Sequence, residues 1–165
     1  MLIVCLNTEI CPAGMEVFNQ NCYKFVDSPK TWADAETECK GQSWKGNQGH
    51  LASLHSEEEQ SFISSLSSER LWLGGNDLQK EGHWTWTDGS ATTYKNWYPD
   101  NPSNHGGNEH CMELYASSDR KWNDIDCANK FKFVCKFTEG NTTIDEIKEL
   151  KLFYCRSSME KDIWS

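Results

Sequence analysis

The chain has 165 residues, and its 25 acidic and 16 basic side chains give a formal net charge of −9. This length predicts one domain that is large enough to bury a core. Because no cluster of Lys and Arg could follow a phosphate backbone, the charge excludes nucleic acid as a partner. The opening MLIVCL is too short an apolar run for a signal peptide or a membrane span. We therefore expect no membrane insertion, and any targeting segment to have been removed or to lie outside this sequence.

Eight cysteines occur in the chain, and no two of them form a Cys-x-x-Cys pair of the kind that holds metals. A disulfide framework is therefore expected, which places the protein outside the cell as a secreted protein. Apolar residues make up only 37% of the sequence, but eight Trp, seven Phe and five Tyr supply large side chains for packing. The core should be rich in aromatic residues.

The first half of the chain predicts a strand pair and two helices. Residues 11–25 have the pattern of a short strand pair. Residues 28–40 begin with Ser and Pro, as helices often do, and continue with apolar residues at helical spacing. Within residues 49–66, Ser56 is followed three positions later by Glu59, which is the pattern of a capping box at the start of a second helix.

Strands are predicted to dominate from residue 71 onward, because helical periodicity gives way to alternating aromatic patterns bounded by turn residues. A long polar stretch lies between Trp86 and Trp122. It is too long for an inert connection in a compact domain, and such loops often carry function. Within it, residues 101–111 read NPSNHGGNEHC and display many side-chain oxygens.

The charged segment after Phe137 differs in character from the rest of the chain. Its apolar residues are spaced for a short amphipathic helix. Asn141 begins an Asn-Thr-Thr glycosylation sequence, which is typical of an exposed site on a secreted glycoprotein. The apolar positions of the predicted helix are Ile144, Ile147, Leu150 and Phe153.

Four motifs from residue 72 onward form an ordered set. They are Trp-Leu-Gly at 72–74, Trp84-x-Trp86-x-Asp88-Gly89, x-Pro-x at 101–103, and Trp122-Asn123-Asp124. With the two predicted helices and the placing of the cysteines, these motifs closely resemble a C-type lectin domain over residues 11–137. Residues 1–10 are then an N-terminal extension and residues 138–165 a C-terminal tail.

The resemblance implies an α+β fold, the C-type lectin-like fold in its long form with an extra N-terminal disulfide. Two helices flank two small antiparallel sheets, and a long loop region lies on top. Cys5 and Cys155 either bond to each other, tying the two ends of the chain together, or bond to a partner chain. The other cysteines are implied to pair as Cys11–Cys22, Cys39–Cys135 and Cys111–Cys127.

Calcium is the cofactor that the resemblance implies. In the family it lies where the x-Pro-x loop, a later Glu and the Asn-Asp of the last motif converge, and sugar hydroxyls complete its coordination. The chemistry is sound, because calcium takes about six to eight oxygen ligands from carboxylates, amides and carbonyls. A cis proline in this loop would turn the two flanking side chains to the same side. Carried over position by position, the calcium ligands are Asn101, Ser103, Glu109, Asn123 and Asp124.

The two positions that flank the proline depart from the family pattern. Relatives that prefer mannose-type sugars carry Glu and Asn there, and galactose binders carry Gln and Asp, whereas this chain has Asn101 and Ser103. With two carboxylates instead of three, we expect a calcium Kd no better than about 10⁻⁴ to 10⁻³ M.

The type of sugar stays open, because an amide and a hydroxyl can each donate or accept hydrogen bonds. His105 holds the place of the aromatic residue that galactose binders typically carry, which favours mannose-type ligands. The sugar-binding residues that the resemblance implies are Asn101, Ser103, His105, Glu109 and Asn123.

An accessory calcium site in relatives corresponds to Asp77, Glu81, Asn104 and Glu109. The residue after Glu109 is His110, where relatives commonly have Asp. Occupancy of this second site is left open.

The leading hypothesis is a secreted, calcium-dependent lectin that recognises terminal sugars on glycoproteins or microbial surfaces, as in innate immunity. A homo-oligomer is expected, because single sugar sites bind weakly and need avidity. One alternative is a protein-binding module that keeps the fold without binding sugar, and another is an ice-binding protein. No nucleophile elbow or similar setting surrounds a Ser or His, so an enzyme is not expected.

Overall fold

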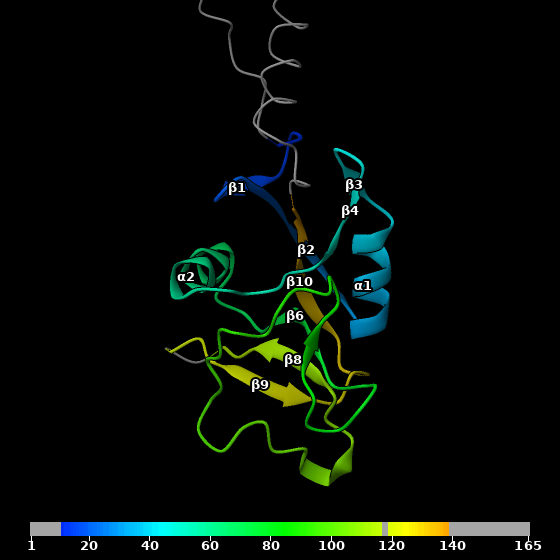
Figure 1. The fold of residues 1–165 in the computed structure, drawn as a ribbon, viewed down its shortest axis with the longest axis vertical. Helices are drawn as coiled ribbons and strands as arrows, with labels where there is room; N and C mark the ends of the chain where they lie inside the picture. Colours follow the sequence, from blue (N-terminus) through cyan, green and yellow to red (C-terminus); the bar gives the residue numbers. More distant parts are fainter. Residues whose placement is uncertain (1–10, 117–118, 139–165) are drawn as a thin grey trace, which may run out of the picture.

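The computed structural model describes residues 11–116 and 119–138, and Figure 1 shows two helices placed on either side of a twisted sheet. The helices are α1 (Trp32–Lys40) and α2 (Glu57–Leu66). A short 3-10 helix, η1, covers His105–Gly107. The strands are β1 (Glu16–Phe18), β2 (Asn21–Lys30), β3 (Ser43–Trp44), β4 (Asn47–Gln48), β5 (His50–Leu51), β6 (Leu71–Asn76), β7 (Thr85–Trp86), β8 (Cys111–Leu114), β9 (Trp122–Ile125) and β10 (Phe131–Phe137).

The larger sheet follows the order β1-β2-β10-β6-β8-β9, with β5 paired to β10 and β7 paired to β6. The pairing of β10 with β6 is parallel, and the other pairings in this sheet are antiparallel. A second, two-stranded antiparallel sheet consists of β3 and β4. The α+β class with two flanking helices is confirmed, but the larger sheet is mixed rather than wholly antiparallel. A parallel pair needs a long connection, and the segment from β7 to β9 supplies it between β6 and β10.

Helix α1 begins at Trp32, later than the sequence predicts. Residues 28–30 instead extend β2, where Lys30 pairs with Phe131 of β10. Thr31 caps the helix, and its hydroxyl accepts a hydrogen bond from the Asp34 N–H at 3.3 Å. Pairing across the sheet therefore overrides the local Ser-Pro signal.

Helix α2 begins where the sequence predicts, with Ser56 as its cap. The Ser56 hydroxyl accepts from the Glu59 N–H at 3.2 Å. The Glu59 carboxylate accepts from the His55 N–H at 2.8 Å, one residue before the partner that a standard capping box uses. The reciprocal bonding that fixes the start of the helix is kept, with this shift of one residue.

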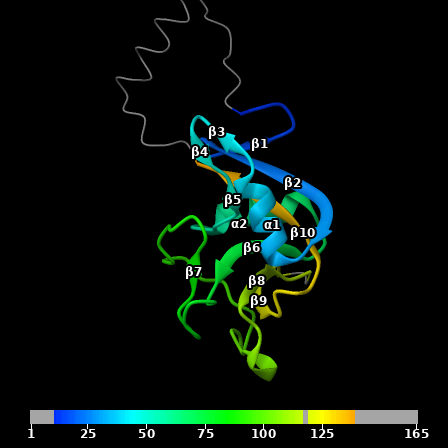
Figure 2. The same cartoon turned by 90° about the vertical axis from the view of Figure 1, so that its right-hand side faces the viewer.

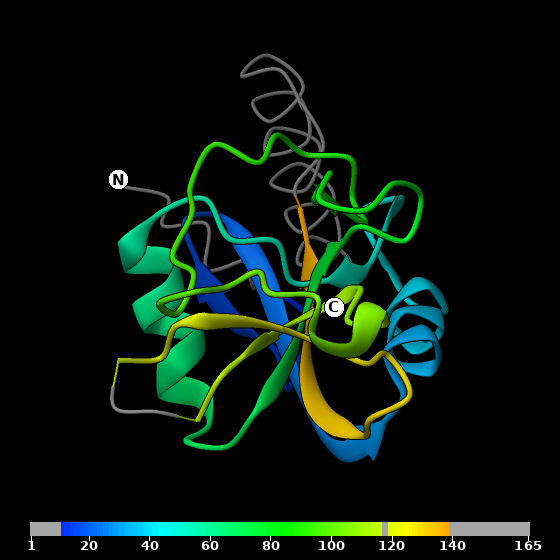
Figure 3. The same cartoon turned by 90° about the horizontal axis from the view of Figure 1, so that it is seen from below.

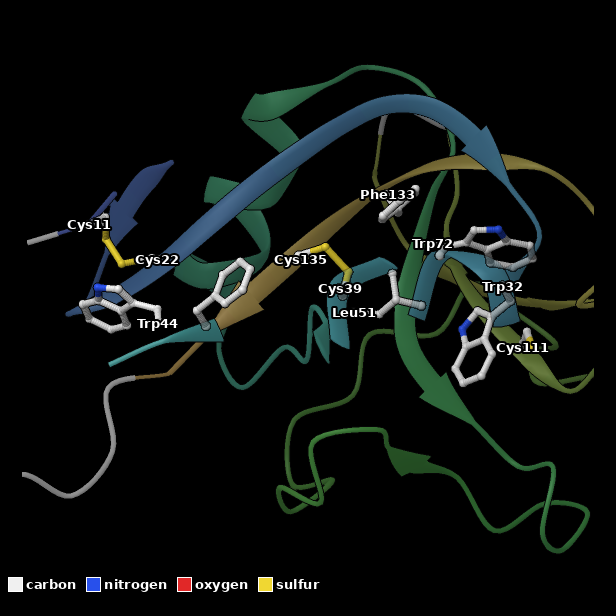
Figure 4. Close-up of a cluster of buried hydrophobic side chains, with 12 residues drawn as sticks. Cys11, Cys22, Trp32, Cys39, Trp44, Leu51, Trp72, Cys111, Phe133 and Cys135 are labelled. Carbon is white, nitrogen blue, oxygen red and sulfur yellow. A yellow bond between two sulfur atoms is a disulfide. The ribbon is translucent and has the colours of Figure 1, made fainter. Parts of the chain in front are cut away.

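The core is rich in aromatic residues, as the composition predicts. Trp72, Trp122, Tyr23, Phe133 and Phe137 are among its largest fully buried side chains. Figure 4 shows one of the buried clusters, in which Trp32, Trp72 and Phe133 lie along the sheet with Leu51. The Trp32 and Trp72 ring nitrogens donate to the Leu73 and Lys30 carbonyls at 2.8 Å, so the burial leaves these polar atoms satisfied.

Among the described residues, three disulfides join the cysteines in the pairing that the resemblance implies. They are Cys11–Cys22, Cys39–Cys135 and Cys111–Cys127. The first links the segment before β1 to β2, the second links α1 to β10, and the third links the start of β8 to the turn that follows β9. The first two are visible as yellow bonds in Figure 4. Cys5, Cys155, Asn141 and the predicted tail helix lie outside the described residues.

A charged cluster is buried between the sheet and α2. The Lys136 ammonium donates to the Glu59 carboxylate at 2.5 Å and to the Ser53 carbonyl at 3.1 Å. The Tyr23 hydroxyl donates to the same Glu59 oxygen at 2.6 Å. Burial, followed by the charge of Glu59, raises the pKa of Tyr23 well above its usual value. The three side chains form a paired polar centre within the apolar core.

The long segment between β7 and β8 lies at one end of the molecule, beyond β8 and β9, in both Figure 1 and Figure 2. Figure 3, which looks at that end, shows the segment and η1 crossing in front of the sheet. The polar loop is therefore placed at the end of a disulfide-linked sheet (Figure 1).

No helix in the described part of the chain is long and apolar enough to span a bilayer.

Candidate functional site

The long loop between β7 and β8 is attached to β9 by backbone hydrogen bonds. The Tyr98 N–H donates to the Trp122 carbonyl and the Trp122 N–H donates to the Asn96 carbonyl, each at 2.8 Å. Trp97 also packs edge-on against the Trp122 ring. Because Trp122 is buried and directly precedes Asn123 and Asp124, these contacts bring residues 101–109 against the strand that carries the last sequence motif.

Asp124 holds the middle of the loop in place. Its side chain is buried, and one carboxylate oxygen accepts from the Ser103 N–H at 3.0 Å. The other oxygen accepts from the Asn104 N–H at 2.6 Å. Two backbone donors therefore fix the carboxylate, and the carboxylate in turn fixes the turn that follows Pro102.

Glu109 closes the loop from its far end. One of its carboxylate oxygens accepts from the Ser103 hydroxyl at 3.2 Å and from the His105 N–H at 2.7 Å. Its own N–H donates to the Asn104 side-chain oxygen at 3.1 Å. Ser103 thus contacts both Asp124 and Glu109. Within residues 11–116 and 119–138, neither carboxylate forms an ion pair with Lys or Arg.

Asn101 and Asn123 are placed differently from the three residues that meet at Ser103. The Asn101–Pro102 peptide bond is cis, as expected, and the Asn101 N–H donates to the Tyr98 carbonyl at 3.0 Å. The Asn123 amide nitrogen donates to the Glu113 carboxylate at 2.9 Å. This bond leaves the amide oxygen of Asn123 as the atom that could bind a cation.

Glu113 and Arg70 support Asn123, and sequence reasoning missed both. Glu113 lies opposite Asn123 on β8 and is fully buried, and Arg70 donates two hydrogen bonds to its carboxylate. The hydrogen bonding of Arg70 to the Glu113 carboxylate, which accepts from it, raises the pKa of the Arg70 guanidinium. The signal in the sequence was the acidic residue in the otherwise apolar strand Cys111–Leu114, where a buried charge needs a partner.

The residues expected at the accessory site fall into two groups. Asp77 and Glu81 lie with His110, whose ring nitrogen is 3.0 Å from an Asp77 oxygen and 3.4 Å from a Glu81 oxygen. Asn104 and Glu109 bond to each other in the loop instead. His105, expected to contact sugar, is exposed on η1 and uses its N–H to bind Glu109.

The sequence matches the Lectin C-type domain over residues 28–137. The chain belongs to the C-type lectin family. The resemblance that its motifs carry is therefore confirmed. The match covers well over half of the chain. It includes both helices, the loop of the candidate site and the strands from β3 onward.

C-type lectins and ice-structuring proteins both occur among the similar sequences. A C-type lectin of Micrurus corallinus is 42% identical, over 76% of this chain and 82% of the relative. A type-2 ice-structuring protein of Hemitripterus americanus is 37% identical, over 78% and 75%. An alpha-N-acetylgalactosamine-specific lectin of Patiria pectinifera is 38% identical, over 75% and 78%.

Solved structures with the same fold include members of both kinds. The C-type lectin CEL-I from Cucumaria echinata has a TM-score of 0.73 at 31% identity, covering 76% of this chain and 96% of that one. A calcium-independent type II antifreeze protein has a TM-score of 0.70 at 36% identity, covering 76% and 92%. The C-type lectin-like fold is thus shown, and the fold alone does not select the ligand.

Proposed function

We propose that this protein is a secreted lectin that binds terminal sugars on glycoproteins or microbial surfaces in a calcium-dependent way. The observation that carries the proposal is the convergence of two carboxylates on Ser103, which donates through its N–H to Asp124 and through its hydroxyl to Glu109. The donors to these carboxylates are neutral, so their charge is not compensated by a cationic side chain of the described residues. A concentration of acidic oxygens of this kind suits a hard cation.

The chemistry of the surrounding residues fits calcium. Bound calcium would supply open coordination positions for two neighbouring hydroxyls of a sugar ring. In this proposal its ligands are oxygens of Asn101, Ser103, Glu109, Asn123 and Asp124. Glu113 orients the Asn123 amide, and the backbone N–H groups of Ser103 and Asn104 orient Asp124. Side chains of the same set can also donate to, or accept from, the sugar hydroxyls.

We expect a weak site that acts through avidity rather than through single contacts. With one carboxylate fewer than is usual in active relatives, the calcium Kd should be no better than about 10⁻⁴ to 10⁻³ M. A homo-oligomer would compensate for the weak binding of each sugar site. The proposal is that of a binding protein and not of an enzyme.

A glycan array in calcium, repeated in chelator, tests the proposal. The array should include mannose-type sugars, which His105 favours. It should also include galactose-type sugars, because the relative from Patiria pectinifera is named as specific for alpha-N-acetylgalactosamine. Retention in calcium that disappears in chelator is the expected result. Retention that chelator leaves unchanged would contradict the calcium dependence. No retention on any glycan would contradict sugar binding and favour the protein-binding alternative.

Ice binding is the second candidate function. It is favoured by one observation, the similarity to an ice-structuring protein and to the structure of a calcium-independent antifreeze protein. A protein of this kind would produce thermal hysteresis that persists in chelator. A cooled sample that shows no hysteresis at millimolar protein concentration would remove this candidate.

A further inference from the structure

A compact group of three metal-ligating side chains lies beside the candidate calcium site. The His110 ring nitrogen Nδ1 is 3.0 Å from Asp77 Oδ1 and 3.4 Å from Glu81 Oε2. One ligand atom from each of the three residues lies within 4.8 Å of the other two. This is the one group of three or more His, Cys and acidic side chains with such spacing in the described part of the chain.

The backbone holds the three residues together. Asp77 directly follows β6 and His110 directly precedes β8, and the two strands pair with each other. The pairing continues beyond the strands, because the Asp77 N–H donates to the His110 carbonyl at 3.2 Å. A tight turn then returns the chain toward Asp77, and the Lys80 N–H donates to the Asp77 carbonyl at 3.0 Å. Glu81 follows this turn directly.

The Asp77 carboxylate is buried and is held at one oxygen. Only 2% of the residue is exposed, and its Oδ2 accepts from the Gly82 N–H at 2.7 Å. Gly82 has a φ of +74°, which glycine adopts without strain. The other oxygen, Oδ1, is left to face His110. Glu81 and His110 are partly exposed, at 56% and 31% of their side chains, so the group is open to solvent on one side.

The donor set does not fit calcium well. Calcium takes about six to eight oxygen ligands, and here an imidazole nitrogen holds a central position. The two other residues that an accessory calcium would need are committed elsewhere, since the Asn104 side chain accepts from the Glu109 N–H and the Glu109 carboxylate binds Ser103 and His105. All three bonds lie within the loop, and none of them involves His110.

The same donor set does fit zinc. Zinc binds imidazole nitrogen and carboxylate oxygen at about 2.0 to 2.2 Å, usually with four ligands in a tetrahedron. Ligand atoms in such a tetrahedron are separated by roughly 3.4 Å, which follows from those bond lengths. The separations of 3.0 and 3.4 Å about His110 are close to this value. Three protein ligands and one open position are the usual composition of an accessible zinc site.

We propose that Asp77, Glu81 and His110 bind a zinc ion, with water or a ligand of a partner molecule in the fourth position. His110 is what changes the metal preference, because it places a nitrogen ligand where relatives commonly carry a carboxylate. This inference does not rest on the proposed lectin function, since none of the three residues belongs to the predicted primary calcium site.

Calorimetric titration of the full, metal-stripped chain with zinc, and separately with calcium, tests the proposal. We expect zinc to bind at one equivalent and to bind much more tightly than calcium does to the same three residues. His110→Gln should raise the zinc Kd by more than about tenfold, since the loss of even an outer-shell partner costs about 10- to 100-fold. Glu81→Gln should also raise the zinc Kd.

Two further variants make the result specific. His83→Gln changes an exposed histidine two residues from Glu81 that is not part of the group, and it should leave zinc binding unchanged. His110→Asp should weaken zinc binding and strengthen calcium binding, because it replaces nitrogen with oxygen. A folded His110→Gln protein, checked by circular dichroism, that binds zinc as the wild type does would overturn the proposal. No zinc binding by the wild type would overturn it too, and would leave an ordinary hydrogen bond between His110 and Asp77.

Discussion

Two clusters of acidic oxygens in this protein are built in opposite ways. In the first, Glu59 is buried and its oxygens receive the Lys136 ammonium, the Tyr23 hydroxyl and the His55 N–H. In the second, Asp124 and Glu109 receive only backbone N–H groups and a serine hydroxyl. The first cluster is closed by a cation of the protein itself. The second is well oriented, but no Lys or Arg of the described residues pairs with it.

The difference indicates how one fold separates stability from binding. A buried charge that is fully paired is costly to disturb, and it can serve only the folded state. A carboxylate that is fixed by neutral donors keeps its charge available to a ligand and does not have to change conformation when the ligand arrives. We therefore expect substitutions in the first cluster to change stability, and those in the second to change binding.

Substitution Lys136→Met should have the largest effect on stability. It removes the cation and leaves Glu59 buried without its charged partner, which costs about 3–5 kcal/mol for a pair of this kind. Urea denaturation measures the free energy of unfolding. Lys130→Met, at an exposed position, is the matched control and should change stability by less than about 0.5 kcal/mol. If both variants unfold at the same urea concentration, the closed cluster does not stabilise the fold.

Substitution Glu109→Gln should separate binding from stability. Glutamine can keep the acceptor that Ser103 and His105 use, so the midpoint of thermal unfolding without calcium should stay near the wild-type value. Loss of the charge should raise the calcium Kd by at least about tenfold, or about 1.4 kcal/mol, because fewer ligand charges mean weaker binding. Retention on a calcium-dependent glycan column should fall with it.

The matched control is Glu16→Gln, which removes the same charge at an exposed position on β1. It should leave calcium affinity and glycan retention unchanged. Equal weakening by Glu109→Gln and Glu16→Gln would mean that only the net charge matters, and that the loop holds no specific site.

The smallest effect concerns the pH dependence of stability, through His55 beside the buried cluster of Glu59 and Lys136. Burial, followed by repulsion from Lys136, lowers the pKa of His55, although Glu59 and Asp88 oppose the shift. The unfolded chain therefore binds more protons than the folded one as the pH falls through 6.5, and stability falls with it until the lower pKa of the folded state is passed.

His55→Gln should make the free energy of unfolding less dependent on pH in this range. Denaturation midpoints at several pH values between about 5 and 8 measure the slope. His83→Gln changes an exposed histidine and should keep the wild-type slope. A slope that His55→Gln leaves unchanged would assign the pH dependence to other groups.

The sequence predicted local features better than those that depend on distant pairing. The Ser56 cap was predictable because donor and acceptor lie three residues apart. The late start of α1 was not, because the pairing of Lys30 with Phe131 across the sheet decides it. The parallel pairing of β6 with β10 was missed for the same reason.

The candidate site followed the same division. The resemblance supplied the ligand set, and the structure brings Ser103, Glu109 and Asp124 of that set together. The meeting of His110 with Asp77 depends on the pairing of β6 with β8, which local periodicity does not reveal. The support that Glu113 gives to Asn123 likewise depends on the register of β8 and β9.

Calorimetric titration of the metal-stripped chain with calcium, for the wild type and for Asp124→Asn, tests the central claim most directly. The cluster of Asp124 and Glu109 should bind calcium with a Kd of about 10⁻⁴ to 10⁻³ M. The variant should lose that binding while it stays folded by circular dichroism. A wild-type protein that takes up no calcium at millimolar concentration, or a folded variant that binds as the wild type does, would contradict it.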